Sequence, residues 1–174
     1  MSNENLTLPE IFDRVTSQYS SNIFCKIVKE NSTEEVTFGR LRETVLKTAG
    51  LIRREGAKEG DYIVLLAGNR FEWAVCYFAI ISLGAVAVPL NPEYSGGEIK
   101  NLLLSSEAKI LITSAGIYKK KINEEVRKDL NKIILLDGED TDAGRRVISF
   151  SETNGIEPLE NFYRVKPQDC ASLI

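Results

Sequence analysis

Four short apolar runs alternate with helix-like segments between residues 61 and 136, and this alternation restricts the fold more than any other feature. The runs are DYIVLLA at 61–67, AVAV at 85–88, KILIT at 109–113 and KIILL at 132–136. Runs that are apolar at successive positions indicate strands buried on both faces, as in parallel sheets. Right-handed crossovers place the intervening helices against the sheet. The sequence therefore predicts an α/β fold, a doubly wound, mostly parallel sheet with helices on both faces.

Three helices are expected between these strands. Asn69 and Glu72 resemble the ends of a capping box, so the first helix should begin there and run through Ser82. A full capping box, SGGE at residues 95–98, marks the start of the second helix. The third helix is identified by an apolar face made of Ile122, Val126 and Leu130.

Residues 1–60 are expected to add an N-terminal helix and a β-hairpin to the sheet. Apolar residues at helical spacing predict the helices, and turn-forming residues between two extended runs predict the hairpin. The elements expected are a helix over 8–19, strands over 22–29 and 35–37 around a turn at 31–33, and a second helix that Thr37 caps and Gly56 stops.

The composition of the chain changes after the fourth strand. An acidic turn, DGEDTD, occupies residues 137–142, and VISF at 147–150 is either a short strand or the lead into a helix. A polar linker follows, and ASLI at 171–174 has the composition of a strand that is only beginning. The chain thus divides into N-terminal elements at 1–60, a sheet core at 61–136, and a linker with the start of a truncated strand at 137–174.

A continuous apolar stretch from Trp73 to Leu90 allows two interpretations. It is eighteen residues long with Ser82 as its polar side chain, which is close to the length of a membrane span. Gly84 and Pro89 divide it, however, so a buried helix followed by a buried strand explains it equally well and agrees with the pattern on either side. No secretory signal is apparent, and we expect a cytoplasmic protein without a transmembrane segment.

The composition excludes several classes of site. The chain has no histidine, which removes the commonest general base and the commonest metal ligand. Its three cysteines, Cys25, Cys76 and Cys170, are far apart and form no CxxC motif, so neither a zinc site nor a disulfide framework is expected. A net charge of −3 gives no reason to expect nucleic acid as a partner. We expect no catalytic and no metal-binding residue in this chain.

Loops at the carboxyl ends of the strands are where an open α/β sheet binds ligands, but here they carry no GxGxxG or GxxxxGK[ST] motif. Arg70 could bind an anion or only solvate its turn, and Lys119-Lys120-Lys121 could meet a phosphate or form a solvated helix face. Asn91 and Tyr94 flank a loop where a ligand could lie, although Tyr94 could equally pack on the neighbouring proline. Asp137 is either a phosphoacceptor or an ordinary turn residue.

Several motifs, taken together and in order, resemble the adenylate-forming enzymes. VTFGRL at 36–41 is similar to the T-[YF]-x-x-L motif that opens this family, and a GD-x-V…N…E…GAV-x-V-P-x-NP pattern matches residues 60–92. EAKILIT at 107–113 continues the match, and DCASLI at 169–174 resembles the strand that leads into the phosphate-binding loop of the family. The resemblance covers roughly residues 8–174, and the Asn at position 91 is more similar to the acyl-CoA synthetases than to the peptide synthetases.

The resemblance implies the N-terminal part of an acyl-CoA synthetase, which uses ATP, Mg²⁺ and CoA to convert a carboxylic acid into an acyl-adenylate and then a thioester. In the family the phosphate-binding loop, the adenine motifs and the catalytic lysine all follow the position matching Ile174. No catalytic residue therefore carries over, and we expect the isolated chain to be inactive and to hold no bound cofactor. The resemblance places Asn91, Tyr94 and Lys119 near the CoA nucleotide.

Two alternatives remain open at this point. The chain could be a non-catalytic, flavodoxin-like binding or assembly module, or a piece of a peptide-synthetase adenylation domain. If it is a fragment, an apolar surface should be exposed where the remainder of the enzyme packs, and the chain should tend to self-associate.

Overall fold

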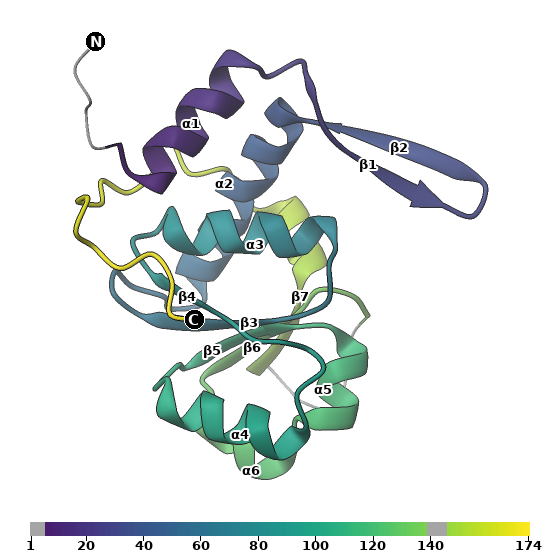
Figure 1. The fold of residues 1–174 in the computed structure, drawn as a ribbon, viewed down its shortest axis with the longest axis vertical. Coiled ribbons are helices and arrows are strands. Elements are labelled where there is room, and N and C mark those ends of the chain that lie inside the picture. Colours follow the sequence, from purple (N-terminus) through teal and green to yellow (C-terminus); the bar gives the residue numbers. More distant parts are fainter. Residues whose placement is uncertain (1–5, 139–145) are drawn as a thin grey trace.

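A five-stranded parallel sheet forms the centre of the molecule (Figure 1), as a computed structural model of residues 6–138 and 146–174 describes it. Every neighbouring pair of strands is parallel, and the order across the sheet is β4-β3-β5-β6-β7. The doubly wound α/β prediction is confirmed. The strands are β3 (Tyr62–Leu66), β4 (Val86–Pro89), β5 (Ile110–Thr113), β6 (Lys132–Leu135) and β7 (Val147–Ser149).

Helices cover both faces of the sheet (Figure 1). Alternate residues of each strand point to opposite faces, so in β3 the side chains of Ile63 and Leu65 join one apolar core while those of Val64 and Leu66 join the other. Both cores consist of buried apolar side chains, and this explains why the strands read as unbroken apolar runs. The first core packs under α1 (Leu8–Gln18), α2 (Phe38–Arg54) and α3 (Phe71–Ile81), and the second under α4 (Gly96–Ser105), α5 (Ala115–Lys121) and α6 (Glu124–Asp129).

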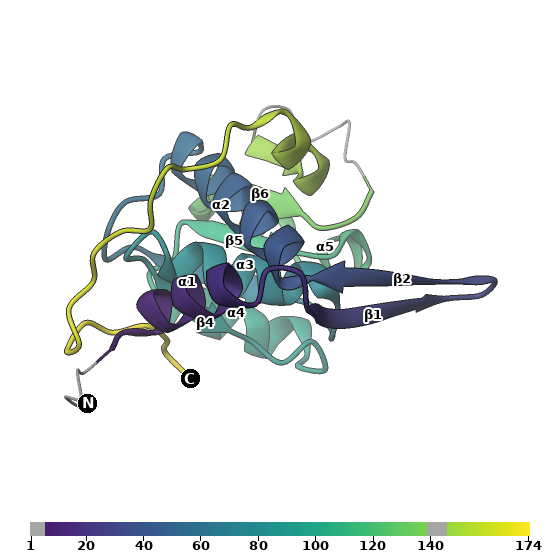
Figure 2. The ribbon, with the colours of Figure 1, turned by 90° about the horizontal axis from the view of Figure 1, so that it is seen from above.

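A β-hairpin projects from the body of the molecule (Figure 2). It consists of β1 (Ile23–Lys29) and β2 (Ser32–Thr37), which pair antiparallel from Lys29 opposite Ser32. The hairpin prediction is confirmed, but the predicted turn at residues 31–33 is wrong. Ser32 and Thr33 belong to the strand, and the turn is confined to Glu30 and Asn31.

Helix ends follow the capping signals in most places. Thr37 accepts a hydrogen bond from Arg40 N at 3.2 Å, and Ser95 forms the expected capping box at the start of α4. Gly56, with a φ of 103°, follows the end of α2 as predicted. The prediction for Asn69 is wrong, because the N-cap of α3 is Arg70, whose side chain makes no capping hydrogen bond.

The helix expected around residues 122–130 is divided in two. α5 ends at Lys121, and Asn123 starts α6 by accepting a hydrogen bond from Val126 N at 3.1 Å. Ile122, Val126 and Leu130 are all buried, as their spacing predicted, but Ile122 and Leu130 lie at the ends of the helices and not on one continuous helical face.

The apolar stretch from Trp73 to Leu90 forms most of α3 and the whole of β4, which confirms the helix-and-strand interpretation. None of the helices in the described ranges is both long and apolar enough to span a bilayer. After β7, a short 3-10 helix, η2 (Phe150–Gly155), leads into a segment without helix or strand, and Ser172 then forms a parallel bridge with Ala87 of β4. Of the predicted acidic turn, residues 139–142 lie outside the described residues.

Candidate functional site

The strand order places a switch point between β3 and β5, because the chain leaves β3 toward β4 on one side and returns to β5 on the other. Ligands of open α/β sheets bind at such a point, beside the carboxyl ends of the strands. The loops that meet at this edge follow β3 at Ala67, β4 at Leu90, β5 at Ser114 and β6 at Leu136. This edge is therefore the candidate ligand-binding site.

An ion-pair cluster closes the part of the edge above β5. The Arg70 guanidinium, from the loop after β3, lies 2.6 Å from the Asp137 carboxylate, which follows β6, and 2.8 Å from the Glu72 carboxylate. The other oxygen of Asp137 accepts a hydrogen bond from Ala115 N at 2.7 Å. Arg70 is thus held by two carboxylates, so its side chain is already engaged at the position where an anion would bind.

The cluster favours the charged forms of Asp137 and Arg70. Burial raises the pKa of Asp137, but the hydrogen bond from Ala115 N and the ion pair with Arg70 outweigh it, so the pKa lies below its usual value. Burial lowers the pKa of Arg70, but the bonds of its guanidinium to Glu72 and Asp137 outweigh burial, so the pKa of Arg70 lies above its usual value. Asp137 therefore joins the loop after β3 to the start of α5 through its contacts with Arg70 and Ala115 N.

The loop after β4 holds two of the residues for which CoA binding was predicted. Asn91 accepts a hydrogen bond from Glu93 N at 2.9 Å through its side chain, which fixes a tight turn. Tyr94 is 38% exposed and lines a pocket of about 250 Å³ together with apolar side chains. Those side chains include Leu90, Leu102 and Leu173.

A lysine that the sequence did not distinguish holds this loop in place. The Lys121 ammonium donates hydrogen bonds to the Pro92 carbonyl oxygen at 2.6 Å and to the Tyr94 carbonyl oxygen at 2.8 Å. Lys119, the lysine predicted to bind CoA, is exposed on the same helix, two residues before Lys121. The structure therefore brings Asn91 and Tyr94 together beside the end of α5, with Lys121 joining the loop to that helix.

The cysteines do not form a site among the described residues, where all three are free. Cys76 is fully buried in α3, and burial raises the pKa of its thiol far above the usual value. A thiol in this state is unreactive, as its apolar sequence context predicted. In the described ranges, no group of three or more potential metal-binding side chains lies close together.

Fold and loops together define a class of protein: a doubly wound α/β domain with its candidate site at the carboxyl edge of the sheet. The chain belongs to the AMP-binding enzyme family, whose profile matches residues 12–174. The predicted resemblance to adenylate-forming enzymes is confirmed.

Curated relatives of this chain include crotonobetaine/carnitine–CoA ligases. The protein of that name from Salmonella typhi is 32% identical over 127 residues, which cover 71% of this chain and 24% of the relative. The corresponding protein of Salmonella typhimurium is equally similar, at 32% identity over 127 residues. This chain thus spans about a quarter of the length of the curated relatives that it matches.

Solved structures show the same fold. A long-chain-fatty-acid–CoA ligase from Archaeoglobus fulgidus superposes with a TM-score of 0.82 at 21% identity, over 99% of this chain and 34% of that one. Coronafacic acid ligase from Pectobacterium brasiliense gives a TM-score of 0.84 at 24% identity, over 96% of this chain and 33% of that one. At these identities the likeness establishes the fold alone.

Proposed function

We propose that this chain is the N-terminal part of an ATP-dependent acyl-CoA synthetase and is catalytically inactive by itself. In the complete enzyme a carboxylate oxygen of the substrate attacks the α-phosphorus of ATP and displaces pyrophosphate. The thiol of CoA then attacks the acyl carbonyl carbon and releases AMP. Adenylation helps because AMP is a far better leaving group than an oxygen of the free carboxylate.

The observation that carries this proposal is the family match over residues 12–174, joined to curated relatives that are named as CoA ligases. The strand order β4-β3-β5-β6-β7 is also that of flavodoxin-like domains, so the order alone would not exclude a non-catalytic module. The family match favours the ligase over that module. The names of the relatives favour a CoA ligase over a peptide-synthetase adenylation domain.

The described residues do not fit a nucleoside triphosphate with its magnesium ion. Arg70 is engaged by Glu72 and Asp137, and within the described ranges no cluster of carboxylates is suited to a divalent cation. We therefore assign no step with ATP or Mg²⁺ to these side chains. We propose that the exposed Lys119 and the Asn91–Tyr94 loop contact the nucleotide portion of CoA.

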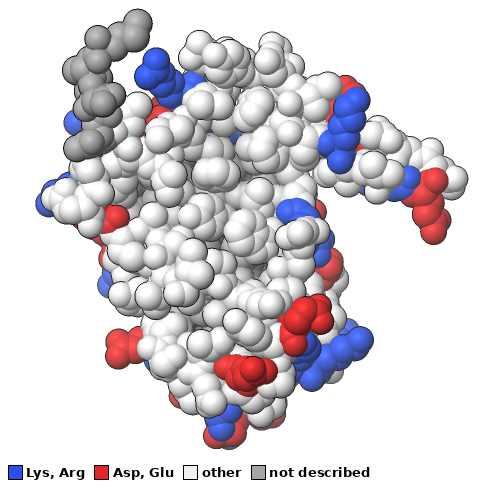
Figure 3. All heavy atoms as spheres, viewed as in Figure 1, with Lys and Arg blue, Asp and Glu red and all other residues white. Residues whose placement is uncertain are grey.

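Self-association and a cytoplasmic location belong to the same proposal. A broad face with few charged side chains lies where α3 and the end of the chain are found (Figure 3). Leu102, Leu104 and Leu173 are among the exposed apolar side chains of the molecule. Such surfaces favour contacts with other protein, and sedimentation at rising concentration would show them as an increase in mean mass.

The proposal is tested by exchange of radiolabelled pyrophosphate into ATP. If the reading frame continues past Ile174, the longer protein should catalyse exchange that depends on a carboxylic acid, and adding CoA should release AMP and thioester. The 174-residue chain should show only the background rate. Exchange by the purified short chain would overturn its proposed inactivity. A longer protein without exchange across a panel of carboxylic acids would overturn the assignment as a ligase.

A further inference from the structure

Residues 156–170 form an extended segment, here called the strap, that crosses the outside of the first helical layer (Figure 2). It contains no helix or strand and joins the end of η2 to the residues that pair with β4. Two backbone hydrogen bonds attach it on the way. Leu159 N donates to Leu46 O of α2 at 3.4 Å, and Tyr163 N donates to Ser82 O after α3 at 2.9 Å.

Two glycines make room for the strap. A Cβ atom on Gly50 of α2 would lie 2.8 Å from Ile156 Cγ2. A Cβ atom on Gly84 would lie 2.7 Å from Cδ1 of the Tyr163 ring. Both distances are shorter than any ordinary contact, so the strap lies at its present depth only because these positions lack side chains.

Side chains of the strap fix it further. The Phe162 ring packs edge-on against Phe12 of α1, with centroids 5.8 Å apart, and the guanidinium of Arg42 lies 5.3 Å from the same centroid. The Tyr163 hydroxyl donates a hydrogen bond to the Glu59 carboxylate. The strap is therefore anchored at several points by contacts of different kinds.

The strap leads to the free edge of β4, where residues 171–173 pair with that strand in one register. Ala87 N donates to Ala171 O at 3.0 Å, and Leu173 N donates to Ala87 O at 2.9 Å. Between these two bonds, the Ser172 hydroxyl lies 2.9 Å from the Tyr77 hydroxyl of α3. A shift by one residue would turn Ser172 away from Tyr77, because successive side chains of a strand point to opposite faces.

We propose that the strap is a positioning device, in which Gly84 and Tyr163 set the register of residues 171–173 on β4. The inference rests on the proposed function in one respect: the family resemblance places the phosphate-binding loop directly after Ile174. In the complete ligase, the strap would then determine where that loop stands relative to the sheet. Gly84 and Tyr163 would influence the reaction without touching a substrate.

The test compares two glycines with the same backbone conformation. Gly84→Ala adds a methyl group against Tyr163, at a φ of 72° that strains any L-residue. Gly60→Ala imposes the same strain at a φ of 77°, but nothing lies within 4 Å of its Cβ, so it is a matched control. The readout is hydrogen–deuterium exchange of the Leu173 amide, alongside the thermal midpoint.

Gly84→Ala should raise exchange at Leu173 about tenfold more than Gly60→Ala does, because opening of the bridge is a local event. Tyr163→Ala, at an exposed position, should also raise it, and in the double variant the two effects should be less than additive. Equal exchange at Leu173 in the two glycine variants, with no change in Tyr163→Ala, would overturn the proposal.

The same variants in the longer ligase address the reaction. Gly84→Ala and Tyr163→Ala should lower kcat for pyrophosphate exchange or raise KM for ATP, whereas Gly60→Ala should change neither beyond its effect on stability. Faster exchange at Leu173 with unaltered kinetics would overturn the role in positioning the loop. If the unmodified longer protein does not exchange pyrophosphate into ATP, the proposed function fails. Hydrogen–deuterium exchange at Leu173 still tests whether the strap sets the register of residues 171–173.

Discussion

Lys119, Lys120 and Lys121 are identical in type and consecutive in sequence, yet the structure gives them different surroundings. Lys119 and Lys120 are exposed, whereas Lys121 binds two carbonyl oxygens of the loop after β4. The difference arises from where α5 ends, since Lys121 is its last residue and faces the neighbouring loop. Lys121 therefore supports the fold of this loop, whereas the charges of Lys119 and Lys120 stay exposed.

Reversing the charge of Lys119 tests its proposed contact with CoA. In the complete ligase, Lys119→Glu should raise the apparent requirement for CoA about fivefold, because an exposed charge contributes on the order of 1 kcal/mol to binding. Adenylate formation, measured as pyrophosphate exchange without CoA, should not change. Lys120→Glu is the matched control, with the same change of charge on an exposed neighbour. An unaltered CoA requirement in Lys119→Glu would remove this residue from the site.

At the residue scale the sequence predicted those contacts that depend on near neighbours. Thr37 and Ser95 cap their helices because the hydrogen bonds join residues three apart, which a local pattern contains. The prediction for Asn69 was wrong because the helix begins after Arg70, and the side chain of Arg70 binds Asp137, 67 residues away, which a local pattern does not contain. The link from Lys121 to the loop was missed for the same reason, since no signal in a run of three lysines identifies the one that folds back.

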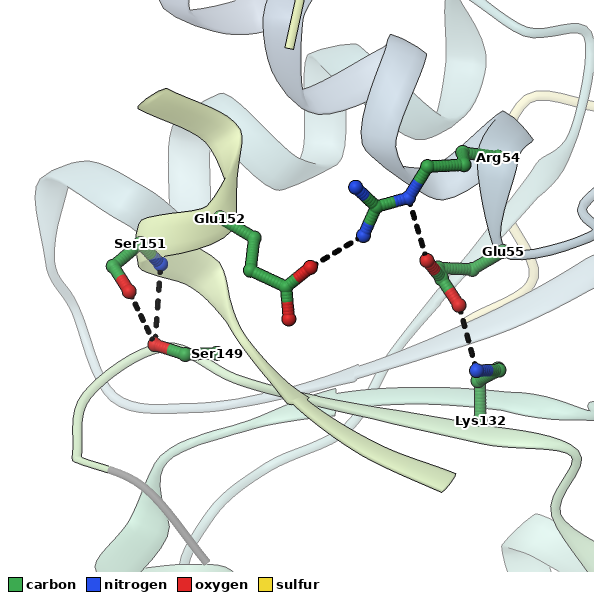
Figure 4. Close-up of polar contacts among 6 residues, drawn as sticks. All are labelled: Arg54, Glu55, Lys132, Ser149, Ser151 and Glu152. Carbon is green, nitrogen blue, oxygen red and sulfur yellow. Dashed lines mark hydrogen bonds and ion pairs between the residues drawn. The ribbon is translucent and has the colours of Figure 1, made fainter. Parts of the chain in front are cut away.

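At the scale of elements, a chain of ion pairs joins α2, β6 and η2 (Figure 4). Glu55, at the end of α2, lies 2.8 Å from Arg54 and 2.7 Å from Lys132 at the start of β6, and its side chain is only 10% exposed. Arg54 extends the chain to Glu152 of η2, whose side chain is 41% exposed. Burial opposes the charge of Glu55, but the bonds from Lys132 and Arg54 outweigh it and lower the pKa.

Glu55→Gln should destabilise the fold by about 2 kcal/mol, because two cations lose their partially buried partner. Glu152→Gln should cost below about 1 kcal/mol, since exposed ion pairs contribute little. Urea denaturation at neutral pH measures both.

The contribution of Glu55 should depend on pH. A carboxylate whose pKa is lowered by folding stabilises the folded protein above its unfolded pKa of 4.5, and this contribution disappears as the pH falls through the folded pKa. The difference between Glu55→Gln and the parent should therefore shrink on acidification; equal costs for the two variants would contradict this account.

Elements with strong periodicity were predicted well, and their boundaries less well. The β3–β6 strands were found because each is buried on both faces, which leaves an unbroken apolar run. The break between α5 and α6 was missed because Ile122 and Val126 keep helical spacing across it, although Asn123 caps a new helix there. The short β7 could not be separated from a helix lead-in, since three residues carry too little pattern to distinguish them.

At the scale of the whole molecule, the described residues form a parallel sheet with an apolar core on each face. Parallel strands could be predicted from burial, but their order depends on long-range packing that apolar runs do not encode. The order in turn decides which loops meet at the carboxyl edge. There Arg70 is already engaged by ion pairs and Lys121 by hydrogen bonds to the loop after β4.

Calorimetric titration of the 174-residue chain with ATP and Mg²⁺ tests this account most directly. The account predicts heats equal to those of dilution, because the groups that would hold the phosphates are expected to lie beyond Ile174. A titration of the longer protein under the same conditions serves as the positive control and should saturate. Saturable, tight binding of ATP by the short chain would contradict the claim that it is the scaffold portion of a ligase.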